Sequence, residues 1–418
     1  MISSWGVMGW SAAVVLGLFG CILMVRSPRI AFSVFLVSYL IPLSLWGTTS
    51  SGFVVDTRPL GIVALGCQTL HLAARSRPKI RPLDRRNKIA AGAYFMSTLA
   101  LASGTWSNDP GRSAQSGLAW LVLGVALFVF SRRLPPPEIH TVVALLLLSV
   151  TFSSAVACLI AFPDAFNAGR ARGIMFNSNG LGLVCALSLP VLLTSKSTLL
   201  RLSSPVPLLL IVLTQSRASA AAAIVGVGVI VIYRMRTWAR WILVPTGAAL
   251  ILTLSQGIIE IISSSDVLLL RGNNSRADIW ALALAQIQDN PLLGVGFGAL
   301  QSESGSSYLK LLSEMGALGA TAGLLLIGAM IAAARGSALM SSLLAVSLVD
   351  AAFEGWLFVA GSLYCAVLMF FLYTNYMTVE LAGVDNDLMG GNRANSAIRR
   401  SPQPTCENAP PIPAGALP

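Results

Sequence analysis

Charged side chains are scarce in this chain. Asp, Glu, Lys and Arg make up 11% of its 418 residues, whereas hydrophobic residues make up 55% and the mean hydropathy is +0.75. Because a soluble globular domain carries about 25% charged residues, this composition excludes an ordinary soluble fold and predicts an integral membrane protein. The net charge of +11 forms no basic stripe interleaved with aromatic residues, so we expect no nucleic-acid partner.

Cysteine and histidine are also few, and neither is arranged as a ligand set. The 6 cysteines are scattered without a CxxC spacing, and of the 2 histidines, His71 and His140, only His71 has a cysteine within a few residues, Cys67. No HExxH motif is present. The pattern therefore predicts neither a disulfide framework nor a zinc site, and we expect a reaction that uses no metal ion and no cofactor.

Long apolar runs dominate the rest of the chain. A helix that crosses a bilayer needs about 20 mainly apolar residues, and the sequence predicts an all-α, polytopic transmembrane helical bundle of about 12 to 13 spans. The spans lie near residues 8–25, 30–47, 56–74, 88–105, 115–131, 140–162, 178–195, 198–214, 217–233, 240–257, 308–333, 337–353 and 356–377. The first run lacks the basic start of a signal peptide, so we expect a retained helix.

Basic residues recur in every second loop. They are Arg26 and Arg29, the run from Arg75 to Lys88, Arg132 and Arg133, Lys196 and Arg201, and Arg234 and Arg240. The positive-inside rule places these loops in the cytoplasm, so that loops 106–114, 163–177, 214–217 and 258–307 lie outside. We expect N-terminal helices over 1–162, a core over 163–377, and a disordered cytoplasmic tail over 378–418.

The long outer loop, about 258–307, contains a helix signal. Ser275 and Asp278 are spaced as at a helix start, and Asn290-Pro291 ends the run. Apolar residues recur between them at helical spacing: Ile279, Trp280, Ala283, Leu284 and Ile287. We expect an amphipathic helix lying along the membrane, or a loop helix packed on the bundle, followed by a tight turn at Gly294-Val295-Gly296.

Several arginines lie at the outer edges of the predicted spans, although basic residues are usually concentrated on the cytoplasmic side. They are Arg170, Arg172, Arg217 and Arg276. An anionic substrate at that face would explain them, because guanidinium groups bind phosphate oxygens in bidentate fashion. The alternative is that each arginine extends to the interface from a helix end for structural reasons. Asn177 and Asn179 could bind sugar or phosphate, or cap a helix.

Four motifs in this region carry a family resemblance. They are Arg170-Ala171-Arg172-Gly173-Ile174-Met175-Phe176-Asn177-Ser178-Asn179, Thr214-Gln215-Ser216-Arg217-Ala218-Ser219-Ala220, Ser275-Arg276-Ala277-Asp278-Ile279-Trp280 with Asp289-Asn290-Pro291-Leu292-Leu293-Gly294-Val295-Gly296, and Tyr308-Leu309 through Glu314-Met315-Gly316-Ala317-Leu318-Gly319. Their order and spacing over roughly residues 165–320 resemble the O-antigen ligase and O-antigen polymerase family of bacterial membranes.

The resemblance implies a metal-independent glycosyltransferase. Its donor would be a glycan on polyprenyl pyrophosphate, and its active site would face outward from the bacterial inner membrane. We predict that Arg217 takes part in catalysis and that the substrate is bound by Arg170, Arg172, Arg276 and Tyr308, together with Asn177, Asn179 and Glu354. A chain-length regulator and other polysaccharide export proteins are the expected partners, with the lipid bilayer itself.

Transfer to a sugar hydroxyl also needs a general base. Many proteins of this family have a His at the position that Gly305 holds here. Glu303 is the nearest carboxylate that could replace it, with Glu314 as the second candidate. Asp350 and Glu354 share a helix face, where they could hold an acceptor sugar or pair with the outer arginines.

Taken together, these residues predict a polysaccharide polymerase that acts in exopolysaccharide synthesis at the cell envelope. It would join lipid-linked repeat units on the outer face. A ligase that transfers the glycan to a lipid or other acceptor is the alternative with the same fold. A transporter of lipid-linked glycans is the alternative of another class, although transporters tend to carry their ionisable groups near the bilayer midplane.

Overall fold

The computed structural model describes residues 19–41, 57–75, 88–160, 164–235, 277–300 and 305–375. They belong to the first of two units, Met1–Tyr376. The second unit, Met377–Pro418, contains the predicted tail and lies outside the described residues. So do most of the basic run 75–88, the predicted span 240–257, Arg276 and Glu303.

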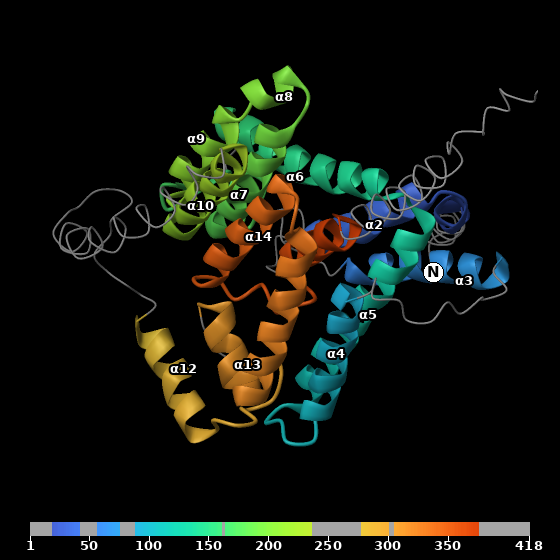
Figure 1. Ribbon diagram of the computed structural model, residues 1–418, viewed down its shortest axis with the longest axis vertical. Coiled ribbons are helices and arrows are strands. Elements are labelled where there is room, and N and C mark those ends of the chain that lie inside the picture. Colours follow the sequence, from blue (N-terminus) through green and yellow to red (C-terminus); the bar gives the residue numbers. More distant parts are fainter. Residues whose placement is uncertain are drawn as a thin grey trace, which may run out of the picture. The chain divides into compact units, whose positions relative to one another are not determined.

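The described residues are mainly helical, with two very short strands, which confirms the all-α prediction (Figure 1). The helices are Phe19–Arg26, α2 (Pro28–Leu40), α3 (Arg58–Arg75), α4 (Lys88–Ser103), α5 (Pro110–Arg133), α6 (Pro136–Leu159), α7 (Ser178–Thr194), α8 (Thr198–Leu202), α9 (Pro205–Thr214), α10 (Arg217–Arg234), α12 (Ala277–Asp289), α13 (Ser307–Ala334), α14 (Ala338–Ala351) and Leu363–Asn375. The short strands β1 (Phe166–Asn167) and β2 (Arg170–Ala171) pair antiparallel.

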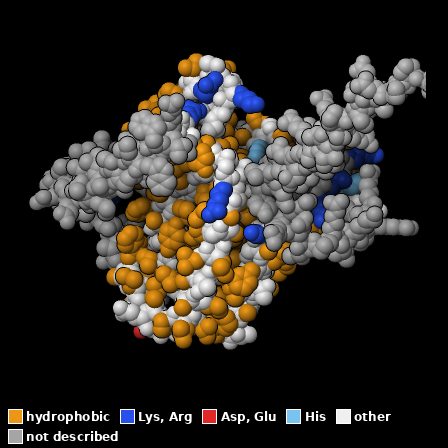
Figure 2. Space-filling view, in the orientation of Figure 1, with side chains coloured by type: hydrophobic (Ala, Val, Ile, Leu, Met, Phe, Trp, Pro, Cys, Tyr) orange, Lys and Arg blue, Asp and Glu red, His pale blue; other side chains and the backbone are white. Residues whose placement is uncertain are grey.

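Among the described helices, α5, α6, α10 and α13 are each long and apolar enough to cross a membrane. A fifth span results if Phe19–Arg26 and α2, which meet at 116°, count as one. Hydrophobic side chains cover much of the described surface in Figure 2, and large ones such as Ile224 and Leu324 are 73% and 70% exposed. Such a surface suits lipid contact and a polytopic fold. The total of 12 to 13 spans stays a prediction.

Two predicted spans differ from the structure. Residues 198–214 form two helices, because α9 begins anew at Pro205, which has no amide hydrogen to continue α8. The predicted span 356–377 starts as a helix only at Leu363. Residues 352–362 form turns, and they are held by Ser307, whose hydroxyl donates to the Glu354 carbonyl (2.6 Å) and accepts from the Leu357 amide (3.0 Å).

The helices pack together through buried side chains, which form a shared core. Helix α7 packs against α6, α9, α10 and α14, and most of its side chains are buried. Farther along the bundle, Phe32, Phe35, Phe130 and Phe370 form an aromatic cluster with ring centroids 4.7–6.3 Å apart. This cluster joins α2 and α5 to the last described helix, so segments far apart in sequence share one apolar interior.

The helix predicted between residues 275 and 290 is present as α12 and ends before Asn290-Pro291, as expected. It packs on α13, where the Ser313 hydroxyl donates to the Ala283 carbonyl (3.2 Å). Ala283 is buried, but Leu284 is half exposed, so the buried face is narrower than the sequence predicted. The contact with α13 supports the alternative of a loop helix packed on the bundle.

Helix α13 is bent at Gly316, whose φ of 56° and ψ of −148° break the helix. The turn after α12 supplies partners for the backbone groups released there. The amides of Val295 and Gly296 donate to the carbonyls of Ser313 (3.1 Å) and Glu314 (2.8 Å), and those of Ala317 and Leu318 donate to Pro291 (2.8 Å) and Leu292 (3.3 Å). The glycine-rich turn, residues 291–298, therefore fixes the bend of α13.

Gly316→Ala is expected to destabilise the protein by several kcal/mol. A φ of 56° strains any Cβ-bearing residue by about 1–3 kcal/mol, and a Cβ would lie 2.5 Å from the Leu292 carbonyl carbon. Thermal unfolding of the detergent-purified variant measures the effect. Gly328→Ala is the matched control, because it lies in the same helix with open space around it. Equal melting temperatures for both variants would contradict the role of the bend.

Candidate functional site

Several helix ends meet at one place and are joined by side-chain hydrogen bonds. At the start of α7, the Asn179 amide donates to the Glu354 carboxylate (2.9 Å), which follows the end of α14. Near the start of α10, the Ser219 hydroxyl donates to Asp350 (3.2 Å) on α14. The Ser307 amide at the start of α13 donates to the Glu354 carbonyl (3.1 Å). Three helix N-termini thus converge, and each carries partial positive charge.

Arg170 extends this network from β2. Its Nε donates to the Thr214 carbonyl (2.9 Å) at the end of α9, and its terminal nitrogen donates to the Asn179 side-chain oxygen (2.5 Å). Because Asn179 donates in turn to Glu354, the three side chains form one chain of hydrogen bonds. Asn177 caps α7 by accepting from the Asn179 amide (2.9 Å), so the predicted capping role is confirmed for Asn177.

A cavity of about 540 Å³ opens beside this network. Its polar wall holds two cations, Arg58 and Lys310, and two carboxylates, Asp350 and Glu354. Asn177, Asn179 and Tyr364 also line it. Asp350 is fixed by the Trp356 indole N–H (2.9 Å) in addition to Ser219. A volume in this range suits a small-molecule site with a few placed polar groups.

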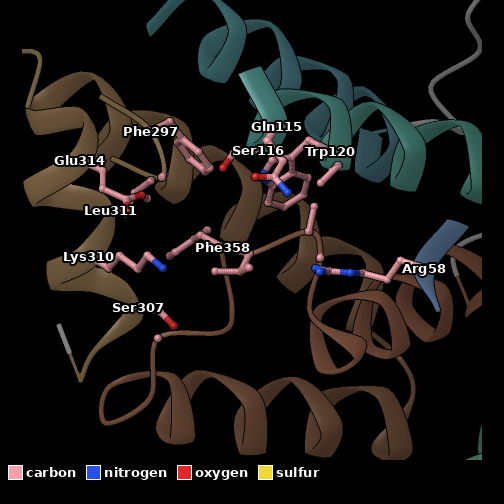
Figure 3. Close-up of a pocket in the computed structure, with 16 residues that line it drawn as sticks. Arg58, Gln115, Ser116, Trp120, Phe297, Ser307, Lys310, Leu311, Glu314 and Phe358 are labelled. Carbon is pink, nitrogen blue, oxygen red and sulfur yellow. The ribbon is translucent and has the colours of Figure 1, made fainter. Parts of the chain in front are cut away.

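A smaller cavity of about 260 Å³ shares Arg58 and Lys310 with the larger one (Figure 3). In Figure 3, Arg58 reaches toward it from α3 and Lys310 from α13, on the opposite side. Helix α5 adds Gln115, Ser116 and Trp120 to the wall, and α13 adds Glu314. The two cations therefore stand where the larger cavity and the smaller cavity meet.

The structure brings together some of the predicted site residues. Arg170, Asn177, Asn179 and Glu354 form the network and, except for Arg170, line the larger cavity. The others lie elsewhere or outside the described residues.

Arg172 pairs with Asp164, donating to its backbone carbonyl (2.6 Å) and to its carboxylate (3.3 Å). Arg217 is exposed as the first residue of α10, and Tyr308 donates to the Leu348 carbonyl (2.8 Å). None of these three is among the described lining residues of the two cavities. Their roles, like those of Arg276 and Glu303 outside the described residues, stay predictions.

Sequence reasoning missed Arg58 and Lys310. The signal was available, because Arg58 starts the predicted span 56–74 and Lys310 starts the span 308–333, both at ends that alternation places outside. The same criterion that selected the other arginines would have selected these two. The sequence could not predict that both cations lie at one cavity, because this depends on how helices α3 and α13, far apart in the chain, pack.

Arg170→Lys is expected to lower activity about tenfold. A lysine ammonium cannot reproduce the fork that binds Thr214 and Asn179 together, and loss of one charge-assisted hydrogen bond costs about 1.5–3 kcal/mol. Arg112→Lys is the control, because the half-exposed Arg112 side chain pairs with Asp109 (3.3 Å). The activities of both variants, measured under the same conditions, decide the outcome, and an unchanged activity of Arg170→Lys would contradict the importance of the network.

One family model, described as O-antigen ligase, matches residues 202–322 of this chain. The matched segment runs from the end of α8 through the first half of α13, and it includes Arg217, Tyr308, Lys310 and Glu314. No curated protein matches the chain. Arg58, Arg170 and Asn179 lie before the matched segment, so the structure, rather than the match, brings them to the site.

Proposed function

From its membership of the O-antigen ligase family, which the match over residues 202–322 supports, we propose that this protein is a polysaccharide polymerase. Glycan transfer of the ligase or polymerase type follows from the family. The finer proposal is that the protein joins oligosaccharide units carried on polyprenyl pyrophosphate, without a metal ion. The site would face outward from the bacterial inner membrane, with the pyrophosphate carrier as the leaving group.

The main observation in support of this proposal is that two cations lie where the two cavities meet. Arg58 and Lys310 would bind the pyrophosphate oxygens and stabilise the negative charge that grows on them as the sugar departs. The nearby N-termini of α7, α10 and α13 add partial positive charge. Asn177, Asn179 and Glu354 on the larger cavity would hydrogen-bond the donor sugar.

The reaction requires one bond exchange. An acceptor hydroxyl attacks the anomeric carbon of the donor sugar, the bond from that carbon to the pyrophosphate oxygen breaks, and the hydroxyl proton passes to a general base. We assign that base to Glu303. In support, Gly305, which holds the position of the His found in similar proteins, lines the larger cavity. Arg217 and Arg276 would assist at the phosphates, because guanidinium groups bind phosphate oxygens in bidentate fashion.

Two other functions remain as alternatives. A ligase would use the same donor but pass the glycan once to a lipid or other acceptor, and the description of the matching family favours it. A transporter would move the lipid-linked glycan without forming a new bond. The larger cavity holds two carboxylates beside its cations, which suits hydroxyl recognition in a transferase. A chain-length regulator is the proposed partner of the polymerase.

Reconstitution separates the three functions. The full chain in lipid nanodiscs is incubated with a polyprenyl-pyrophosphate-linked oligosaccharide, and products are separated by length. A polymerase is expected to form longer lipid-linked glycans and to release one polyprenyl pyrophosphate per bond formed. Single transfer to an added lipid core would indicate a ligase. Absence of any new glycosidic bond, with donor crossing the bilayer of proteoliposomes, would overturn the transferase proposal.

A further inference from the structure

Two residues that line the smaller cavity each carry a buried polar atom without a hydrogen-bond partner in the described structure. The Glu314 carboxylate oxygen Oε1 and the Trp120 indole Nε1 both lack a partner in the described structure, and both residues line this cavity. Glu314 is 2% exposed and Trp120 is fully buried. The first atom can accept a hydrogen bond and the second can donate one.

A buried polar atom without a hydrogen-bond partner lowers the stability of the protein unless a ligand supplies the missing partner. An unsatisfied buried polar group costs about 1–3 kcal/mol, and most buried groups in folded proteins are paired. The glycine-rich turn fixes the backbone of Glu314, because the Gly296 amide donates to the Glu314 carbonyl (2.8 Å). The backbone amides of Gly298 and Leu300 hydrogen-bond the Glu314 carboxyl group, but its Oε1 has no partner among the described residues.

The part of the wall formed by Glu314 and Trp120 favours an uncharged, hydroxyl-bearing ligand. A hydroxyl can donate to Glu314 and accept from Trp120, whereas a phosphate would place its oxygens against the Glu314 carboxylate. Gln115 and Ser116 offer further polar groups, and Phe297 and Phe358 offer apolar faces for the C–H side of a sugar ring. The volume of about 260 Å³ far exceeds the roughly 10–15 Å³ that one water requires.

We propose that the smaller cavity binds a sugar ring of the acceptor glycan. One hydroxyl of this ring donates to Glu314 Oε1, and another accepts from Trp120 Nε1. The assignment rests on the proposed glycan transfer, and it adds the place of the acceptor. Because Arg58 and Lys310 line both cavities, the acceptor ring lies beside the phosphates of the donor in the larger cavity.

Binding of the free acceptor glycan tests this subsite without any transfer. The probe is the oligosaccharide repeat unit released from its lipid by mild acid, and calorimetry measures its Kd for the full chain in nanodiscs. Trp120→Phe keeps the shape of the wall but removes the N–H group, and Glu314→Gln removes the charge. Each is expected to weaken binding about five- to tenfold, the usual effect of losing or neutralising one hydrogen-bond partner.

Trp280→Phe is the matched control. Trp280 also has a buried Nε1 without a partner in the described structure, but it lies on α12, away from the described walls of both cavities. Binding by Trp280→Phe should equal that of the wild type. Unchanged Kd values for both Trp120→Phe and Glu314→Gln would overturn the subsite. Should Glu314→Gln not fold, Trp120→Phe alone decides.

Binding and pyrophosphate release together distinguish an error in the proposed function from an error in the proposed subsite. Wild-type protein that binds the free oligosaccharide, but releases no polyprenyl pyrophosphate from the lipid-linked donor, would contradict glycan transfer and leave the sugar site in place. Normal transfer with unchanged binding in both variants would contradict the subsite alone.

Discussion

Arg58→Ala is expected to lower the rate of glycan transfer about 10²- to 10³-fold, the usual cost of removing one group that stabilises developing negative charge. Lys310→Ala should have an effect of similar size, because both side chains line the larger cavity and the smaller cavity. Release of polyprenyl pyrophosphate by the nanodisc-embedded variants measures the rate. Arg58→Lys should restore only part of it, since an ammonium lacks the bidentate fork.

Arg112→Ala is the control for these variants. Arg112 also lies at an end that the topology places outside, but its side chain is 53% exposed and pairs with Asp109 on the surface (3.3 Å). Its rate should stay near that of the wild type. Variants of Arg58 and Lys310 that both keep more than half of the wild-type rate would show that the pyrophosphate is bound elsewhere.

Glu303→Gln is expected to lower turnover by about 10²- to 10⁴-fold, as loss of a general base does. Donor binding should persist, because the amide has nearly the same shape as the carboxylate. The wild-type rate should fall as pH drops through the pKa of the glutamate, since the protonated acid cannot accept a proton, and this dependence should disappear in the variant. Turnover measured from pH 4 to 8 with purified donor tests both expectations.

Gly305→His in the Glu303→Gln background provides a rescue experiment. Gly305 has a φ of 61°, a conformation that His tolerates better than β-branched residues do. A His that takes over as base should restore turnover with a pH limb near 6.5, the ordinary pKa of the imidazole. Near-wild-type turnover in Glu303→Gln alone would exclude Glu303, and Glu314 would be the next candidate.

The helices were predictable because their apolar runs have the length and periodicity of spans. The predicted spans 178–195 and 217–233 agree with α7 and α10 to within one residue at each end. Residues 352–362 were not predictable in the same way. Their apolar composition resembles a helix start, but long-range hydrogen bonds from Ser307 hold them as turns, and sequence periodicity carries no information on such contacts.

The candidate site was predictable in part. Outer arginines and helix-mouth asparagines follow from charge bias and capping rules, and the structure joins Arg170, Asn177 and Asn179 as neighbours. The cavities themselves depend on how α3, α5, α13 and the segment after α14 pack. In the sequence, Trp120 resembles the other apolar side chains of a span, and only the packing shows that it lines a cavity and that its N–H has no partner among the described residues.

The bend at Gly316 also bears on how deep in the membrane the candidate site lies. The helical residues beyond it, 317–334, extend about 27 Å at 1.5 Å per residue, close to the roughly 30 Å thickness of a bilayer's hydrocarbon layer. The shorter arm, 307–315, carries Lys310 and Glu314 and can then stand at the level of the lipid headgroups. A polyprenyl carrier could thus keep its tail among the acyl chains while its phosphates reach the two cations, so the substrate need not leave the membrane to react.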